Sequence, residues 1–326
     1  MKNDIKTENE AFDADDLNLI TLAREYQDDD KARELFESWR WPGGKPICPH
    51  CKNDGEAKTI SKLTPKVGPR STVRKGLYFC GACRKPFTAT VGTVMEASHI
   101  PISTWMMAFF LICSSKKSIS AHQLHRMLKI TYKSAWFMAH RIRFVFADDA
   151  KTPKLTGTVE VDETFVGGVG DMKTKFSRKI PVVALIERGG KVRTRVVSSV
   201  SQKNLGQCLA ECVDKSAVVN TDEHDAYKPA LKSYKRHDRV NHSRNEYHRR
   251  NPDGTISTTN SAESFFSLLK RGVYGAWHHV SREHLPKYAN EFAFRFGNSK
   301  ISDGARTALA IPLIDGKRLM YRQPVA

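Results

Sequence analysis

Residues 157–168 read Gly-Thr-Val-Glu-Val-Asp-Glu-Thr-Phe-Val-Gly-Gly, and the fold prediction begins from this stretch. Alternating valines, followed by a β-branched and an aromatic residue, predict a strand, and the two glycines mark its exit. Side chains alternate between the two faces of a strand, so Glu163 shares the face of the valines, whereas Asp162 and Glu160 point the other way. An acid on a central strand is unfavourable unless it is paired or binds a metal. By itself this stretch favours an edge strand with solvated carboxylates.

The charge of the chain indicates a polyanionic partner. The 326 residues contain 53 Lys and Arg against 35 Asp and Glu, a formal net charge of +18 at pH 7. The first thirty residues hold ten acids and three bases, so the remainder has 50 bases against 25 acids, an excess of +25. Nucleic acid is the first candidate for such a surface, although anionic lipid and plain solubility also fit.

The sequence indicates neither a membrane anchor nor a secreted disulfide framework. No apolar run approaches the roughly 20 residues of a membrane span. The N-terminus is acidic and lacks the basic-then-apolar form of a signal peptide. Seven cysteines are an odd number, and four of them form two Cys-x-x-Cys pairs, which favours a reducing compartment and metal binding. We therefore expect a cytoplasmic protein without a membrane partner.

The two cysteine pairs predict a structural zinc site. They are Cys48-Pro-His-Cys51 and Cys80-Gly-Ala-Cys83, and the 28 residues between them are enough for a hairpin. Four thiolates presented by two such turns are typical of the tetrahedral zinc of a zinc ribbon. A redox Cys-x-x-Cys is the alternative, but its usual βαβ setting is missing and two copies favour metal. His50 lies inside the first pair and is expected at the surface, not as a ligand.

A helical region follows the cysteine pairs and has the pattern of a helix-turn-helix. Residues 102–114 are apolar enough for a buried helix, and two further helical patterns at 119–128 and 131–143 are separated by a short joint. Contact with DNA and ordinary helix packing are both open for this pair. The basic side chains that would be available to DNA are Lys133, His140, Arg141 and Arg143.

The C-terminal half has the element order of a ribonuclease H-like domain. In that layout the first strand is central and the fourth lies beside it, so the predicted fold class is α/β, with a mixed sheet flanked by helices. The expected elements, in chain order, are strands at 157–168, 179–187 and 191–200, a helix at 205–213, a strand at 216–222, a basic loop at 242–257, and helices at 260–272 and 281–296.

Three acids are brought together by this layout. Asp162 lies near the end of the first strand, Asp222 ends the fourth, and Glu263 on a later helix can complete the cluster. Converging carboxylates cannot all stay ionised without a cation, and hard oxygen ligands select Mg²⁺ or Mn²⁺. Two such ions can activate a water or a 3′-hydroxyl and stabilise the leaving oxygen of a phosphodiester. The predicted chemistry is therefore metal-dependent phosphodiester cleavage and transfer.

Each of these acids also has a structural interpretation. Asp222 can be a turn residue at the strand end, with Glu223 and Asp225 as rival ligands. Glu263 stands three residues after Asn260, where a capping box places an acid for structural reasons.

Two basic residues lie near the end of the same helix. Lys270 is seven residues beyond Glu263, two turns along one face, where it can meet a phosphate, and Arg271 follows it. A lysine there also complements the helix dipole, so this position has an ordinary explanation. Gly272 is expected as the glycine that ends the helix.

Together these motifs resemble the transposases of bacterial insertion sequences that have an N-terminal zinc ribbon and a DDE catalytic domain, the ISXO-two-like group. The resemblance covers residue 35 to about residue 321. The residues that carry it are Arg40-Trp-Pro42, the two cysteine pairs, Val159-Glu-Val-Asp-Glu-Thr-Phe-Val-Gly-Gly168, Asn260-Ser-Ala-Glu-Ser-Phe-Phe-Ser-Leu-Leu-Lys-Arg271 and Glu291-Phe-Ala-Phe-Arg295.

The resemblance implies roles for these residues. Asp162, Asp222 and Glu263 match the catalytic triad, and the ribbon and helical region match the parts that bind transposon ends. Double-stranded DNA, as inverted-repeat ends and as target, is the implied partner, with a dimer or larger homo-oligomer on paired ends. The residues expected to contact DNA are Lys133, Arg141, Arg143, Lys270 and Arg271.

Four segments are expected. They are an acidic segment with short helices at 1–44, a zinc ribbon at 45–95, a helix-turn-helix-like region at 96–150, and a ribonuclease H-like catalytic domain with C-terminal helices at 151–326. The predicted activity is Mg²⁺-dependent cutting at terminal inverted repeats followed by strand transfer. A non-catalytic DNA-binding regulator and a nuclease of the same fold are the alternatives. Intact acids at all three positions speak against the first, and strand transfer from a 3′-hydroxyl end distinguishes the second.

Overall fold

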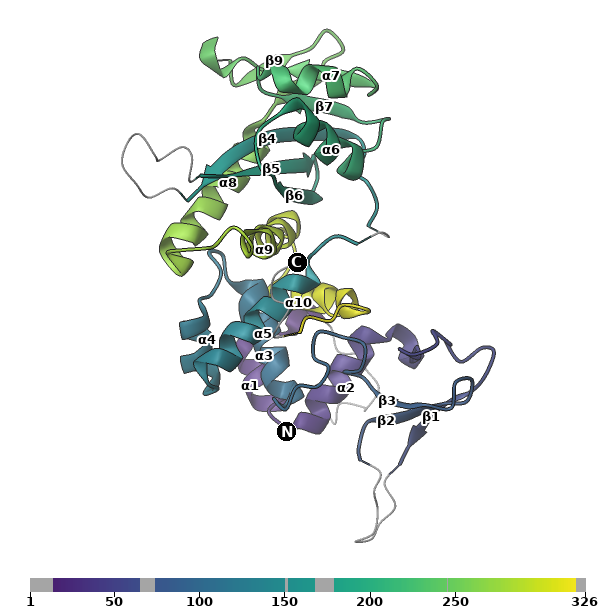
Figure 1. Ribbon diagram of the computed structural model, residues 1–326. Helices are drawn as coiled ribbons and strands as arrows, with labels where there is room; N and C mark the ends of the chain where they lie inside the picture. The colour runs from purple at the N-terminus through teal and green to yellow at the C-terminus, as the bar shows by residue number, and fades with distance from the viewer. Residues whose placement is uncertain (1–13, 65–73, 150–151, 168–178, 245, 321–326) are drawn as a thin grey trace, which may run out of the picture. The chain divides into compact units, whose positions relative to one another are not determined.

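The computed structural model describes residues 14–64, 74–149, 152–167, 179–244 and 246–320, and these form two compact units (Figure 1). The first unit comprises the chain up to Ser114 together with Lys300–Arg318, and the second comprises Ser115–Ser299 with the residues from Leu319 onward. Each is described by itself. The chain passes from the first unit to the second after Ser114, inside the segment predicted at 96–150. The four-segment organisation stays a prediction.

The first unit combines a small antiparallel sheet, in the order β1-β2-β3, with helices. Asp28 caps α2 by accepting the backbone N–H groups of Asp30 and Lys31, and α3 is buried along most of its length against α2 and α10. The short helices expected before residue 41 and the buried helix expected at 102–114 are confirmed. The elements are α1 Leu19–Glu25, α2 Asp29–Arg40, β1 Ile60–Leu63, β2 Leu77–Cys80, β3 Pro86–Thr88, α3 Ile102–Ser114 and α10 Asp303–Ala310.

Arg40 and Trp41 join the end of α2 to the ribbon. The Arg40 guanidinium donates to the carbonyl oxygens of Ala89 and Val91 and pairs with Asp315 at 2.6 Å. The Trp41 ring lies edge-on to the ring of Tyr78, with centroids 5.3 Å apart. A buried guanidinium needs such partners, so this arginine serves the fold of the first unit.

The second unit is built on a five-stranded mixed sheet with the order β6-β5-β4-β7-β8 (Figure 1). Strand β4 is therefore central, antiparallel to β5 and parallel to β7. This is the ribonuclease H-like arrangement expected from the sequence, and the edge-strand interpretation of residues 157–168 is wrong. The strands are β4 Thr158–Val166, β5 Ile180–Glu187, β6 Val192–Val196, β7 Val218–Thr221 and β8 Arg236–Arg239.

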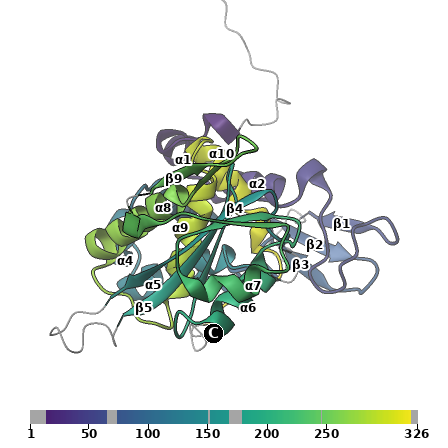
Figure 2. The same cartoon turned by 90° about the horizontal axis from the view of Figure 1, so that it is seen from above.

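Helices cover both faces of this sheet (Figure 2). Each face has its own apolar core. The odd-numbered residues Val159 and Val161 of β4 pack with α6 Gln202–Cys212 and α7 Lys228–Leu231. The even-numbered Val166 packs with α8 Asn260–Gly272 and α9 Leu285–Gly297. Cys208 and Cys212 are buried in the first of these cores. The polar even positions of β4 therefore face α8.

Two further helices, α4 Ala121–Leu128 and α5 Tyr132–Val145, form the pair with the helix-turn-helix pattern. Lys129 ends α4 in the left-handed conformation with φ of 55°, and the Thr131 side chain caps α5 by accepting the Ser134 N–H. Helix α5 contacts α4 on one side and α9 on another. Both helices predicted at 119–143 are confirmed. Helix α5 is more enclosed than it would be if it packed only against α4.

Two details differ from the expected fold. The segment 242–257, expected as a loop, contributes to a two-stranded antiparallel ribbon of β9 His248–Arg250 and β10 Ile256–Thr258. Gly272 has φ of −67°, within the right-handed helical region, so it does not end α8 as a left-handed cap. The chain continues from it into a π-helical turn, Val273–Trp277. Among the described residues, no helix is both long and apolar enough to cross a membrane.

Candidate functional site

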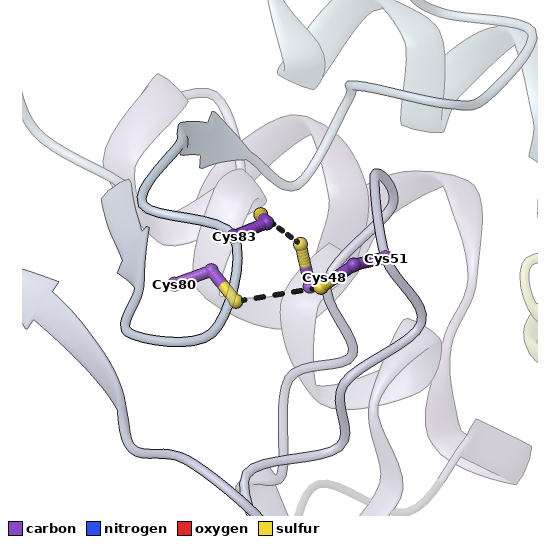
Figure 3. Close-up of side chains that lie close together, drawn as sticks. All are labelled: Cys48, Cys51, Cys80 and Cys83. Atoms are coloured by element: carbon purple, nitrogen blue, oxygen red, sulfur yellow. Dashed lines mark hydrogen bonds between the residues drawn. The ribbon is translucent and has the colours of Figure 1, made fainter.

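The four cysteines predicted to bind zinc lie together at one end of the ribbon (Figure 3). All four sulfur atoms lie within 4.8 Å of one another. The sulfurs of Cys48 and Cys83, and those of Cys51 and Cys80, are each 3.7 Å apart. Zn–S bonds of about 2.3 Å in a tetrahedron place the sulfurs about 3.8 Å apart. The donor set and its spacing therefore fit a structural zinc ion.

The two cysteine pairs are held by turns of the same geometry. The N–H of Lys52 donates to the carbonyl of Cys48, and the N–H of Arg84 donates to that of Cys80, both at 2.9 Å. Lys52 and Arg84 have φ of 63° and 57°, which closes each turn directly behind its second cysteine. His50 is exposed, as the sequence predicts.

The thiols differ in how readily they ionise. Hydrogen bonding from the N–H of Cys83 lowers the pKa of Cys80 to about 6, which favours the thiolate form of this sulfur. Burial raises the pKa of the Cys48 thiol to about 12. A zinc ion stabilises the thiolate form of its ligands, so ion binding and release of the Cys48 proton are coupled.

Asp162 and Asp222 stand at neighbouring positions of two parallel strands. The register of β4 and β7 pairs Glu160 with Asn220. Continuing that register by two residues sets Asp162 beside Asp222, the first residue after β7 ends at Thr221. Parallel strands end at the same edge of a sheet, so both carboxylates lie at one edge.

The acids form one electrostatic cluster around Asp162. Burial raises the pKa of Asp162 to about 7. The N–H of Glu163, which donates to Asp162 Oδ1 at 2.8 Å, opposes the rise, and the negative charges of Glu163, Asp222 and Glu263 add to it. Burial and the neighbouring negative charges both disfavour the ionised carboxyl, and a divalent cation would offset both effects. Oxygen donors of this kind suit Mg²⁺ or Mn²⁺.

The acids are less closely gathered than the cysteines. Within the described residues, the cysteine cluster is the group of His, Cys, Asp and Glu side chains whose ligand atoms are already arranged to hold an ion. Asp162 and Asp222 are half-buried and Glu263 is exposed. A shared cation would therefore draw the carboxylates together from their present positions.

Glu263 lies in the first turn of α8, and that turn is attached to the central strand. The buried carboxylate of Glu160 accepts the backbone N–H of Ser261 at 2.8 Å and a hydrogen bond from Arg188 at 3.1 Å. Glu160 and Asp162 face the same side of β4, and Ser261 is two residues before Glu263. The contact therefore holds the start of α8 against the face of the sheet that carries Asp162.

The start of α8 also removes the capping-box interpretation of Glu263. In the structure α8 begins at Asn260, and Thr259 is the N-cap residue, without a capping hydrogen bond from its side chain. Glu263 is then the fourth helical residue, one beyond the position of the capping-box acid. Its backbone N–H donates to the carbonyl of Thr259 at 3.1 Å, as in an ordinary first turn.

The rival acids have other surroundings. Glu163 points to the opposite face of β4, where it accepts a hydrogen bond from the buried Tyr227 hydroxyl. Asp225 is exposed and paired with basic side chains. Glu223 accepts the backbone N–H of Ser243 at 3.2 Å. None of the three shares the register position of Asp222 beside Asp162.

The basic residues predicted to contact DNA divide into two groups. Lys133 is exposed. Arg143 is only 2% exposed and its Nε lies 2.6 Å from a carboxylate oxygen of Glu291, while Arg141 and His140 are also buried. The prediction that these three α5 side chains are available to DNA is wrong, because α4 and α9 enclose α5 on more than one side.

Lys270 and Arg271 line a cavity of about 870 Å³ at the C-terminal end of α8. Its wall is formed by residues of two segments, 117–123 and 267–278. Lys270 is half-buried and Arg271 is exposed. Both of these predicted DNA-contacting residues are thus open to a ligand.

The sequence pattern did not reveal the role of Glu160 or of Arg188. Glu160 was recognised only as an acid two residues before Asp162. A fully buried acid on an apolar strand requires a partner, and Arg188 follows β5 at the point where its last residue pairs with Val159. The sequence could therefore indicate that Glu160 needs a partner. Only the pairing of the strands identifies that partner as Arg188.

Two segments of the chain match family models of transposase domains. Residues 154–297 match the family model described as the ISXO2-like transposase domain, and residues 27–86 match the transposase zinc-ribbon domain. A relative from Halobacterium salinarum, described as an uncharacterized protein in transposable element ISH50, is 28% identical over 285 residues. That match covers 81% of this chain and 90% of the relative. The zinc-ribbon match includes α2 as well as both cysteine pairs.

Proposed function

Because residues 154–297 match the ISXO2-like transposase domain and residues 27–86 match the transposase zinc-ribbon domain, we propose that the chain cuts DNA at the terminal inverted repeats of an insertion sequence and transfers the cut strand to target DNA. Hydrolysis breaks a phosphodiester bond and leaves a 3′-hydroxyl at the end of the element. That hydroxyl then attacks a target phosphate in line, forms a new P–O bond and displaces a 3′-oxygen of the target.

The observation that carries this proposal is the position of Asp162 and Asp222 at one edge of the sheet, with Glu263 in the first turn of α8 that Glu160 attaches to β4. The raised pKa of Asp162 is consistent with this arrangement. We assign these three acids as ligands of Mg²⁺ or Mn²⁺, which, when bound, supplies the positive charge that activates the attacking oxygen and stabilises the leaving one. Asp162 and Asp222 hold their positions through the sheet, and Glu263 holds its position through α8. Glu160 is a positioning residue, because it ties the first turn of α8 to β4.

The proposed partner is double-stranded DNA, both as inverted-repeat ends and as target. The formal charge of +18 and the exposed basic side chains Lys133 and Arg271 support phosphate contacts. A homo-oligomer on paired ends is part of the proposal, since two ends must be joined to one target. The relative from Halobacterium salinarum, described as a protein in a transposable element, supports this setting.

The test is Mg²⁺-dependent cutting and strand transfer with a labelled duplex taken from the DNA that flanks the gene and contains an inverted repeat. Asp162→Asn, Asp222→Asn and Glu263→Gln each remove a negative oxygen that an uncharged amide cannot replace. We expect each to reduce cutting and transfer by more than about 100-fold. Glu263 is exposed, so the free energy of unfolding of Glu263→Gln should stay within about 0.5 kcal/mol of the wild type.

Glu163→Gln is the matched control, because Glu163 is adjacent to Asp162 but faces the other side of the sheet. It should keep most of the activity. Near-normal cutting by Glu263→Gln would remove that residue from the site. Cutting without any joining of a pre-cut 3′-hydroxyl end would identify a nuclease and contradict the proposed transferase activity.

A further inference from the structure

The side chains that line the cavity at the C-terminal end of α8 are of the kinds that bind an anion joined to a planar group. Its volume of about 870 Å³ lies within the range of about 300–1,000 Å³ typical of ligand pockets. The lining residues are Lys117, Ser118, Ser120, Gln123, Ser267, Lys270, Arg271, Tyr274, Gly275, Ala276 and His278. Hydroxyl, amide and cationic groups therefore surround it, and no carboxylate is among them.

The cationic side chains at this cavity are not neutralised by the described parts of the chain. Lys270 is half-buried, yet no acid of the described residues forms an ion pair with it or with Lys117. Arg271 donates only within its own helix, to the carbonyl and hydroxyl of Ser267 at 3.2 and 3.1 Å. A half-buried lysine without a counter-charge favours the binding of an anion such as a phosphate.

The wall of the cavity is tightly built. A Cβ atom on Gly272 would lie 2.3 Å from Cζ of Phe292 and 3.3 Å from the carbonyl oxygen of Lys117, so the absent side chain lets these segments approach. Ser118 is buried, has φ of 70°, and its hydroxyl has no hydrogen-bond partner in the described structure. The segment 117–123 is thus held against α8 as a defined wall.

One aromatic ring is open to the solvent at this cavity. Tyr274 lies in the π-helical turn after α8 and is 57% exposed, although it is a large ring. Basic grooves with accessible aromatic rings bind unpaired nucleotides, because each base stacks on a ring while its phosphate meets a cation. A paired duplex keeps its bases stacked on one another and cannot use this ring.

The cavity also lies at a suitable distance from the acids. Lys270 is seven residues beyond Glu263 on α8, about 10 Å along the helix axis. Stacked nucleotides of one strand rise by about 3.4 Å each, so this distance corresponds to about three nucleotides.

We propose that this cavity binds an unpaired nucleotide of a DNA strand, with its base on Tyr274 and its phosphate at Lys270 and Lys117. The assignment rests on the proposed function for its ligand class, since DNA is the substrate there. It adds that the strand is locally unpaired about three nucleotides from the reacting phosphodiester.

The test measures DNA binding by fluorescence anisotropy with the full chain and without added Mg²⁺, so that no cutting occurs. Three probes share one sequence: a fully paired duplex, the same duplex with a few mismatched and therefore unpaired nucleotides near one 3′ end, and that mismatched duplex with abasic sites in the unpaired strand. The wild type should bind the second probe more tightly than the first and the third.

Tyr274→Ala should weaken binding of the mismatched probe by about 5- to 150-fold and leave the paired and abasic probes nearly unchanged. Tyr274→Phe, which keeps the ring, should retain the preference. Lys270→Ala should weaken all probes and lower the slope of log affinity against log salt by about one. Tyr247→Ala and Lys215→Ala are matched controls, because both residues are exposed and lie outside the cavity.

Equal affinity of wild type and Tyr274→Ala for the mismatched probe would overturn the assignment. So would an equal loss on paired and mismatched probes, which would indicate a general effect on the surface. The binding assay needs no catalysis, so its outcome is separate from that of the cutting assay. If the protein prefers unpaired bases but cannot cut DNA, only the proposed activity is contradicted. Cutting that is active in a protein without this preference contradicts only the nucleotide site.

Discussion

The buried carboxylate of Glu160 accepts the backbone N–H of Ser261 at 2.8 Å, and this hydrogen bond attaches the central strand to the first turn of α8. Each partner lies two residues before an acid of the proposed site, Asp162 on the strand and Glu263 on the helix. The same carboxylate accepts a hydrogen bond from Arg188 at 3.1 Å, which balances its buried charge. A charged acceptor at a helix N-terminus also interacts favourably with the helix dipole. One buried side chain thus links the central strand directly to the first turn of the helix.

Glu160→Ala should lower the free energy of unfolding by about 1–3 kcal/mol, because the N–H of Ser261 loses its acceptor. It should also raise the Mg²⁺ concentration needed for half-maximal cutting, since the turn of α8 that carries Glu263 is no longer attached to β4. Glu160→Gln keeps an acceptor and should recover most of both effects. Thermal melting and Mg²⁺ titration of cutting measure the two quantities.

Glu187→Ala is the control for that experiment. Glu187 also accepts a backbone N–H, that of Thr156 at 3.1 Å, but it ends β5 beside Val159 and shares the face of Val183 and Leu185, opposite to α8. Because its side chain does not lie on the α8 side of the sheet, its loss should reduce stability without changing the Mg²⁺ requirement. A normal Mg²⁺ requirement in Glu160→Ala would show that this residue serves stability alone.

Cys80→Ser should abolish zinc binding by the ribbon. The wild type should contain about one zinc ion per chain by elemental analysis, because four sulfurs lie within 4.8 Å of one another. The variant should contain almost none, and the first unit should melt at a lower temperature. Cys208→Ser, which changes a buried cysteine outside the cluster, should keep the metal. Full zinc content in Cys80→Ser would exclude the four-thiolate site.

Arg143→Ala should destabilise the second unit rather than act on DNA directly. Its guanidinium pairs with the buried Glu291 at 2.6 Å, and removing one partner of a buried pair costs about 3–5 kcal/mol. Arg295 also lies 3.0 Å from Glu291, so the lower end of that range is expected.

Lys133→Ala is the contrasting variant on the same helix. Lys133 is exposed, so its replacement should leave the melting temperature unchanged. It should weaken binding of duplex DNA and reduce the salt dependence of that binding, as the loss of a phosphate contact does. Unchanged DNA binding by Lys133→Ala would remove the last basic side chain of α5 predicted to reach DNA.

Gly272→Ala should lower the free energy of unfolding by about 1–3 kcal/mol, because the added methyl group would lie 2.3 Å from the ring of Phe292. Gly275→Ala, three residues later, places its methyl group in open space and should change stability by less than about 0.5 kcal/mol. Chemical denaturation of both variants gives the comparison. Equal stability would mean that Phe292 moves aside without loss of packing.

Several features of this protein follow from local sequence alone. The alternation of residues 157–168 predicts a strand and assigns Asp162 and Glu163 to opposite faces, and the structure has both features. The two Cys-x-x-Cys pairs predict their cluster, because each turn is closed by residues adjacent to its cysteines. These predictions succeed because the period of a strand and the geometry of a short turn depend on neighbouring residues.

The remaining features depend on contacts between residues far apart in the chain. Arg143 was expected at the surface, but packing of α9 against α5 encloses it, and its partner Glu291 lies 148 residues away. Gly272 was expected to end its helix as a cap. The close approach of Phe292 and Lys117 instead explains why this position has no side chain. Glu160 and Ser261 are 101 residues apart, and only the pairing of β4 with the start of α8 joins them. The sequence determined which elements form and which faces carry acids, because those depend on local periodicity. The tertiary structure decided which charged groups are buried and paired, because burial depends on the elements that pack against each side chain.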